Sequence, residues 1–165
     1  MKDRWEELLA VLSKMLSIYQ AILTLSKKKH DILVAAKPHE LEIVTKQEEL
    51  LIVQIGKLED LRGKIMDEMM AAHGMKDGEV SLAELKKIAP PAVVEQIEYY
   101  GKEFGSIMTE MVPINKLNTE LIKQALGFIN YNINLLSQTA VGTTYAAKGQ
   151  TTQEPPKRTA FDARV

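Results

Sequence analysis

Residues 73–84 come close to the pattern of a calcium-binding loop. An EF-hand loop needs oxygen ligands at positions 1, 3 and 5, glycine at position 6 and glutamate at position 12. With Gly78 at position 6, Glu84 stands at position 12, but His73 and Met75 occupy positions 1 and 3. Glu84 also completes a helix capping box with the serine three residues before it, which explains it without a metal. We therefore expect a turn followed by a short helix, and no calcium site.

The other residues that could carry chemistry lack the spacing that the chemistry needs. The three histidines, His30, His39 and His73, form no HExxH pattern or other paired metal spacing, and we expect solvated surface side chains. The sequence contains no glycine-rich phosphate loop and no nucleophile elbow. Cysteine is absent, which excludes thiol catalysis, disulfides and thiolate metal sites. We predict a protein that is not an enzyme and binds neither a metal nor another cofactor.

The composition argues against two further classes of partner. A net charge of −1 over 165 residues provides no general field to attract nucleic acid or an anionic membrane. Residues 1–5 lead directly into an amphipathic pattern instead of the apolar core of a signal peptide. No uninterrupted apolar run approaches the ~18 residues of a membrane-spanning helix. These observations predict a soluble cytoplasmic protein with no nucleic-acid binding and no stable membrane insertion.

Two long amphipathic patterns in the first half of the chain predict a helical hairpin. Apolar residues recur at helical spacing through residues 3–36, and Pro38 then suits the first turn of a new helix. The second pattern alternates strictly between three and four residues, as in a coiled-coil seam. Its members are Leu41, Val44, Glu48, Leu51, Ile55, Leu58, Arg62, Ile65 and Met69. Because the connection is short and the helices match in length, we expect an antiparallel pair.

The charged residues of this hairpin have structural interpretations. Glu48 and Arg62 occupy seam positions, where a charge usually pairs with the facing helix and fixes the register. The lysine run at residues 27–29 falls late in the first helix, where it complements the negative helix end. We expect this run to be a solvated face.

The second half of the chain predicts one short and one long helix. A short helix is expected over residues 81–89, and two prolines then separate it from a long apolar pattern. Pro113 lies inside that pattern, so we expect a kink near residues 109–113 without a full break. Residues 142–165 are polar, rich in glycine, proline and threonine, and without period, which is typical of a flexible tail.

The predicted fold class is therefore all-α, with no strand candidate of any strength. A long antiparallel helical hairpin and a further long, kinked C-terminal helix are expected to form a coiled-coil-like bundle. We assign residues 1–141 to one helical domain and residues 142–165 to the flexible C-terminal tail.

Residues 115–136 have a helical pattern that is apolar over about half of the helix circumference. At about 100° per residue, Asn118 and Asn132 fall in the middle of the apolar arc. The arc contains Leu117, Leu121, Ile122, Ala125, Leu126, Phe128, Ile129, Ile133, Leu135 and Leu136. A helix in a compact bundle needs only ~100° of apolar face, and one hairpin is too small to cover the rest. Part of the arc is either an uncovered interaction site, where the asparagines specify the register of an incoming helix, or buried against neighbouring helices or a second subunit.

Several of these features together resemble the FlgN family of flagellar export chaperones. The likeness covers most of the chain and begins with the long first helix. Its motifs are Glu48-x2-Leu51-x3-Ile55-x2-Leu58-x3-Arg62, then Asn115-x2-Asn118-x2-Leu121-Ile122, then Tyr145 and Gly149 in the tail. The loop at residues 73–80 and the final residues, PPKRTAFDARV, depart from the family pattern.

The resemblance implies a cytoplasmic, substrate-specific chaperone of the flagellar type III export system. Such proteins bind the disordered C-terminal segment of a hook–filament junction (hook-associated) protein, prevent its premature assembly and deliver it to the export gate. The expected substrate-binding residues are Asn115, Asn118, Leu121, Ile122, Ala125, Leu126, Ile129, Asn132, Ile133 and Leu136. By the same resemblance, Tyr145 matches a tail tyrosine that docks on the cytoplasmic domain of the export-gate subunit.

A structural or adaptor coiled-coil protein is the alternative interpretation. In that case, self-association through the C-terminal helix into a homo-oligomer would close the wide apolar arc. The two interpretations differ in whether the free protein is a stable oligomer with no uncovered apolar surface.

Overall fold

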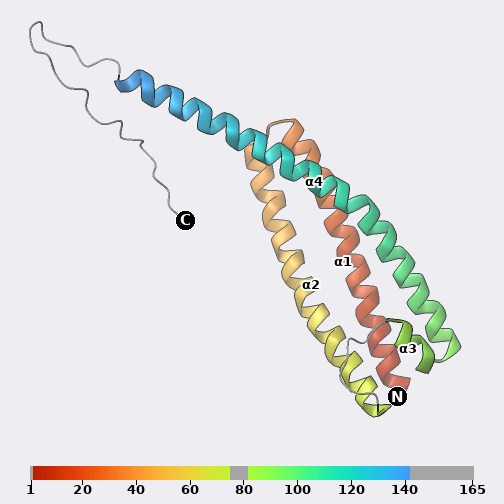
Figure 1. Cartoon of the computed structure of the whole chain (residues 1–165). Coiled ribbons are helices and arrows are strands. Elements are labelled where there is room, and N and C mark those ends of the chain that lie inside the picture. Colours follow the sequence, from red (N-terminus) through yellow and green to blue (C-terminus); the bar gives the residue numbers. More distant parts are fainter. Residues whose placement is uncertain (1, 75–81, 142–165) are drawn as a thin grey trace, which may run out of the picture. The chain divides into compact units, whose positions relative to one another are not determined.

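The computed structural model describes residues 2–74 and 82–141, whose regular elements are helices (Figure 1). These are α1 (Lys2–Val34), α2 (Pro38–Ala72), α3 (Leu82–Ile88) and α4 (Pro91–Val141). The all-α prediction is confirmed. The chain divides into two compact units, residues 1–121 and residues 122–165, and α4 runs through both. The predicted tail, residues 142–165, lies outside the described residues.

Helices α1 and α2 form the predicted antiparallel hairpin and lie side by side (Figure 1). At one end, Arg4 and Glu68 form an ion pair, with 2.6 Å between Nη2 and Oε2. Toward the other end, Ser26 Oγ donates a hydrogen bond to Glu48 Oε1 over 3.3 Å. Every predicted seam position of α2 between residues 41 and 69 is buried or half-buried. The alternation of three and four therefore identified the inward face of α2 correctly.

Two apolar clusters hold the helices of residues 1–121 together. The larger draws on all four helices, and its least accessible members are Leu8, Ile65, Met69, Leu85 and Ile97. The smaller joins α1 to α4 through Leu16, Ile22, Ile107 and Met111. Between the two, the rings of Tyr19 and Phe104 meet edge to face, with centroids 5.7 Å apart. Burial of one such large apolar side chain contributes about 1.5–3 kcal/mol, so these clusters provide the main attachment of α4 to the hairpin.

The connection between α1 and α2 follows from the way α1 ends. The Lys37 N–H donates to the Ile32 carbonyl and the Ala36 N–H to the Leu33 carbonyl, each over 3.2 Å, as in a Schellman motif. Ala36 has a left-handed φ of 53°, which the motif requires and which glycine adopts more easily. Pro38 then occupies the first turn of α2, as predicted.

Helix α4 continues through Pro113 without a break, as predicted. The proline ring removes one backbone donor, which costs the helix the hydrogen bond to the carbonyl four residues earlier. The expected kink near residues 109–113 stays a prediction.

In the described part of the chain, α1 is the one helix with the length and composition of a membrane span. Core helices of soluble proteins pass the same test. The apolar residues Trp5, Leu8, Leu12 and Met15 of α1 are buried among the other helices. Packing within the bundle is therefore a sufficient explanation for the apolar character of α1.

The left-handed residue in the connection gives a stability prediction. Replacement Ala36→Gly should raise the free energy of unfolding by about 0.5–1 kcal/mol, because relief of left-handed strain exceeds the added entropy of the unfolded chain. Urea denaturation followed by far-UV circular dichroism measures this difference. The neighbour Ala35, whose N–H donates to the Asp31 carbonyl, is the control. Ala35→Gly should lower stability, and an equal loss in both variants would contradict the prediction.

Candidate protein-binding surface

The apolar seam of α4 continues in register through both units of the chain. Two series of residues seven apart define this seam. The first is Ile97, Phe104, Met111, Asn118, Ala125 and Asn132, and the second is Tyr100, Ile107, Ile114, Leu121, Phe128 and Leu135. Members up to Leu121 are buried or half-buried, whereas those beyond it are exposed apart from half-buried Asn132. The seam is thus covered within residues 1–121 and open to solvent further along.

Large apolar side chains of α4 beyond residue 121 form what we call the exposed apolar surface. It consists of Leu126, Phe128, Ile129, Tyr131, Ile133, Leu135 and Leu136. Phe128 is 69% exposed and Tyr131 is 63% exposed. Contiguous exposed apolar residues of this kind usually mark an interaction site on a soluble protein. We therefore regard this part of α4 as a candidate protein-binding surface.

Charged side chains are missing from this part of the helix. Residues 124–138 contain no Asp, Glu, Lys or Arg, and at about 1.5 Å per residue they make about 22 Å of helix. The solvent face of a surface helix usually carries charges. In this stretch the exposed polar positions are all uncharged, namely Gln124, Asn130, Asn134, Ser137 and Gln138. A partner that covers this stretch therefore desolvates no charge on α4.

Most of the predicted substrate-binding residues are accessible. The exposed ones are Asn115, Ala125, Leu126, Ile129, Ile133 and Leu136. Leu121, Ile122 and Asn132 are half-buried. The Asn132 Nδ2 donates to the Phe128 carbonyl over 2.9 Å, so this amide is engaged within its own helix.

Three members of the exposed apolar surface were not among the predicted binding residues. Phe128 and Leu135 had been placed in the apolar arc, where their seven-residue spacing was the available signal. Tyr131 lies just outside that arc. Its position beside Leu135 on the helical wheel, about 40° away, was the signal that it continues the same face.

Asn118 differs from the other predicted residues because it is buried, with 2% of its surface exposed. Its Nδ2 donates to the Ser26 carbonyl over 2.9 Å. This contact orients the amide so that Oδ1, 3.2 Å from His30 Nδ1, accepts a hydrogen bond from a protonated Nδ1. The expectation that His30 is a solvated surface residue is wrong, because Asn118 covers it from α4. Asn118 fixes α4 on α1, so we leave it out of the surface offered to a partner.

The expected pairing of Glu48 with the facing helix is confirmed. Glu48 is 7% exposed, and its carboxylate accepts from Ser26 Oγ and pairs with Lys29, both on α1. No buried side-chain nitrogen or oxygen of the described residues lacks a hydrogen-bond partner. Glu48 therefore links α2 to the same turn of α1 that holds Asn118.

The corresponding expectation for Arg62 is wrong. Its Nε lies 3.1 Å from an oxygen of Glu59, one turn away on α2 itself. The α1 side chains that line the same space are Leu12, Met15 and Tyr19, none of which offers a carboxylate. The seam position predicted the direction of Arg62 but not the residue that faces it.

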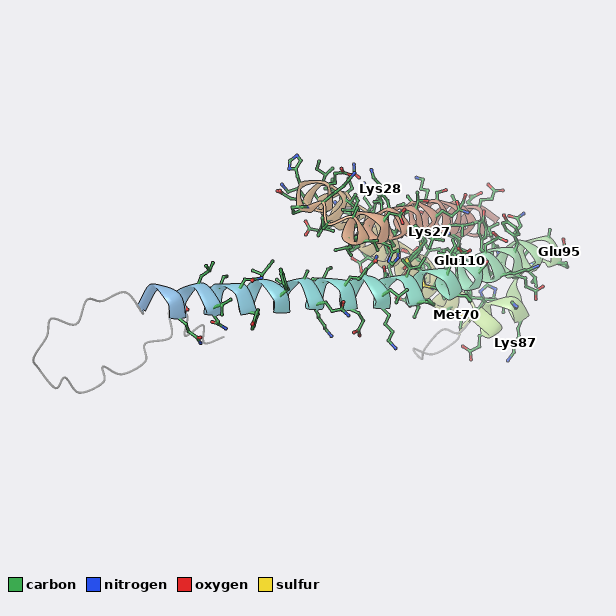
Figure 2. All side chains as sticks on the ribbon, turned by 90° about the horizontal axis from the view of Figure 1, so that it is seen from above. Lys27, Lys28, Met70, Lys87, Glu95 and Glu110 are labelled. Atoms are coloured by element: carbon green, nitrogen blue, oxygen red, sulfur yellow. The ribbon has the colours of Figure 1, made fainter. Side chains whose placement is uncertain are left out.

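The lysine run is solvated only in part. Lys27 and Lys28 are exposed as expected, whereas Lys29 is half-buried against Glu48. Lys27 Nζ lies 2.6 Å from Glu110 Oε2 and so joins α1 to α4 (Figure 2). Exposed ion pairs of this type contribute about 0–1 kcal/mol, which makes this contact minor beside the apolar clusters.

An apolar cavity of about 280 Å³ lies within residues 1–121. Its lining includes Met15 and Tyr19 of α1, Phe104 of α4 and Arg62 of α2. Small-molecule sites combine an apolar lining with several convergent polar groups. The guanidinium here is paired with Glu59, so the cavity gives little support for a ligand site.

His73, the first residue of the segment that resembles a calcium loop, caps the C-terminal end of α2. The His73 Nδ1 donates to the Met69 carbonyl over 2.8 Å at the end of α2. Residues 75–81 lie outside the described residues, so the absence of a calcium site stays a prediction. Within residues 2–74 and 82–141, no group of three or more His, Asp or Glu residues is arranged to hold a metal ion.

Comparison with known proteins defines the class of this helical protein. A family model described as "FlgN protein" matches residues 1–153. The chain therefore belongs to the FlgN family, which is a family of flagellar export chaperones and not of enzymes. A protein of Bacillus subtilis (strain 168), "Uncharacterized protein YvyG", is 25% identical over 125 residues, or 76% of each chain. No solved structure matches the chain.

Two asparagines of α4 provide a matched test of the buried polar contact. Asn118→Ala should lower the free energy of unfolding by about 2 kcal/mol, because it removes one buried and one half-buried hydrogen bond worth about 1 kcal/mol each. Asn115→Ala, at an exposed position one turn earlier, should change it by less than about 0.5 kcal/mol. Urea denaturation measures both variants. Equal effects would mean that Asn118 is not a structural contact.

Proposed function

We propose that the protein is a cytoplasmic chaperone of the flagellar type III export system. Its substrates are hook-associated proteins of the hook–filament junction, and it binds their C-terminal segments. The exposed apolar surface of α4 is the observation that supports this most directly, because a disordered segment needs an accessible apolar face on its carrier. Membership in the FlgN family supports the export role in general terms.

The proposed substrate site is the face of α4 from Asn115 to Leu136, without Asn118. Full burial of a side chain such as Ile129 contributes roughly 1.5–3 kcal/mol. Ordering a disordered substrate segment costs about 2–5 kcal/mol, which offsets the contribution of one or two such contacts. Several apolar residues must therefore act together, and the resulting affinity stays moderate. Moderate affinity suits a carrier that has to release its substrate.

The same contact explains how the chaperone would prevent premature assembly. A substrate segment that associates through an apolar face cannot use that face for assembly while it lies on α4. Binding to α4 also buries the apolar residues of the substrate segment, which lead to nonspecific aggregation when they are exposed to water.

Delivery is assigned to a separate residue. Tyr145, in the tail outside the described residues, would dock on the cytoplasmic domain of the export gate. A single aromatic ring buries a substantial area, but ordering the polar segment around it opposes binding. We expect this contact to be weak and to leave the substrate site unaffected.

Self-association is the second candidate function, that of a structural or adaptor protein. The wide apolar face of α4 favours it too, since a second copy would also cover that face. Light scattering over a range of concentrations, combined with hydrogen exchange along α4, separates the two. A monomer with an unprotected helix beyond residue 121 supports the chaperone.

Charges placed on the exposed apolar surface should abolish substrate binding. The double variant Ile129→Asp with Ile133→Asp should weaken binding of a junction-protein C-terminal segment at least 100-fold, because two large apolar contacts are lost and two charges are desolvated. Isothermal titration calorimetry measures the dissociation constant.

The matched control is Asn130→Asp with Asn134→Asp, which adds the same charges at the same spacing on the polar face of α4. Its affinity should stay within about twofold of the original protein if the added charge itself has little effect. Circular dichroism checks that both variants remain helical. Unchanged affinity in the isoleucine variant would exclude this surface as the substrate site.

Replacement of Tyr145 should separate delivery from substrate holding. Tyr145→Ala should leave substrate affinity unchanged while it reduces binding to the export-gate cytoplasmic domain about tenfold and lowers secretion, and Tyr145→Phe should retain most of the gate binding. Biolayer interferometry and a secretion assay measure the two steps. If Tyr145→Ala loses substrate affinity and keeps gate binding, the roles are reversed.

A further inference from the structure

The exposed apolar surface is wider than one helix covers. At about 100° per residue, the arc from Tyr131 through Phe128 and Ile129 to Leu126 spans about 220°, whereas a helix packed on one side usually has an apolar stripe of about 100°. Two groups of large side chains form the flanks of this arc. The first flank is Phe128, Tyr131 and Leu135, and the second is Leu126, Ile129, Ile133 and Leu136.

The centre of the arc differs from its flanks. Ala125 and Asn132 lie between them, at wheel positions about 20° apart. Alanine presents a small surface there, and the Asn132 amide is held against its own helix by the hydrogen bond to Phe128. The arc therefore has two bulky sides and a shallow, partly polar middle, which is where two neighbouring helices would meet each other over α4.

The flank positions change character along α4. The seven-residue series of Tyr131 includes Glu103, Glu110, Leu117 and Gln124, and that of Leu126 and Ile133 is Pro91, Glu98, Gly105, Val112, Thr119, Leu126 and Ile133. Between residues 98 and 110, where α4 packs on the hairpin, these flank positions carry three glutamates and a glycine and so limit the width of the apolar seam. Beyond residue 121 they carry the uncharged Gln124 and the apolar Leu126, Tyr131 and Ile133. The cover needed there is wider than the cover that the hairpin provides earlier.

The lack of charged side chains on this part of α4 restricts the kind of partner surface that can bind there. Residues 124–138 carry no Asp, Glu, Lys, Arg or His side chain that could pair with a charge on the partner. A charged group brought into this contact would lose its hydration without compensation. The contacting faces of the occupant are therefore apolar or uncharged polar, and binding should depend little on salt.

We propose that the occupant is a pair of amphipathic helices from one substrate molecule, one on each flank of α4. The two helices meet over Ala125 and Asn132, and their contacting faces carry no charge. This inference rests on the proposed chaperone function. Two segments of one molecule are favoured over two separate molecules because the second contact is then intramolecular and avoids a second association cost.

Site-specific photocrosslinking with a full-length junction protein tests whether two substrate helices bind to the two flanks of α4. Benzoylphenylalanine placed at Tyr131 and at Ile133 samples the two flanks at nearly the same height of the helix, and Asn134 on the polar face is the control. We expect the two flank positions to crosslink to two different segments of the same substrate molecule, in a one-to-one complex by light scattering. Asn134 should give little crosslinked product.

Charge variants give a second measurement on the same complex. Tyr131→Lys and Ile133→Lys should each weaken binding at least tenfold, whereas Asn134→Lys should change it less than twofold. The affinity of the original protein should change less than about twofold between low and high salt. A steep salt dependence would contradict an uncharged contact.

The possible outcomes are distinct. Crosslinks from both flanks to a single substrate segment would contradict the proposal of two bound helices and indicate one helix. Crosslinks to a second copy of this chain would also contradict it and indicate self-association. Either result leaves the proposed function standing when the complex itself forms. Failure of the original protein to bind any junction protein would overturn the proposed function together with the inference.

Discussion

The structure depends on the rule that an apolar helix face in water has to be covered. Helix α4 repeats its apolar seam from Ile97 to Leu135 without changing register. Up to Leu121 that seam is buried or half-buried, and its members from Ile97 to Met111 lie in the apolar clusters with α1, α2 and α3. Further along, the same repeat is exposed apart from half-buried Asn132, and its flanks carry the exposed side chains Leu126, Tyr131 and Ile133. Burial of apolar area is the main favourable term in protein association. The exposed part of α4 therefore favours the binding of a partner that buries its apolar side chains.

A small polar cluster fixes the axial position of α4 along the hairpin. Asn118 bonds to Ser26 and His30 of α1, and Glu48 of α2 reaches the same serine and Lys29. Such buried hydrogen bonds add modest net stability, but a shifted arrangement would leave the groups unpaired and cost more. The cluster therefore selects one register among several that apolar contacts alone would allow. By fixing that register, it also determines which residues of α4 the chain leaves uncovered.

Periodicity predicted the faces of the helices well, because burial of one face is a local property of the sequence. The seam of α2 and the start of that helix at Pro38 were both predicted correctly. Which residue faces which is not local. Arg62 was expected to pair across the hairpin and instead pairs with Glu59, and Asn118 was read as part of a binding face although His30 and Ser26 cover it. Those partners depend on the relative height of helices distant in sequence, which a helical wheel does not contain.

The hydrogen bonds and ion pairs of residues 1–121 also imply an order of folding. Near the connection, α1 and α2 meet through contacts separated by 19 to 22 residues, whereas the contacts of α1 with α4 span 83 to 92 residues. Closing the longer loops costs about 1 kcal/mol more by the logarithmic dependence of loop entropy on length. During synthesis the hairpin is complete before α4 has been translated, so it forms first and serves as the template on which α4 acquires its register. The last part of α4 to be made is the part that carries the exposed apolar surface, so these side chains are among the last of the helix to leave the ribosome.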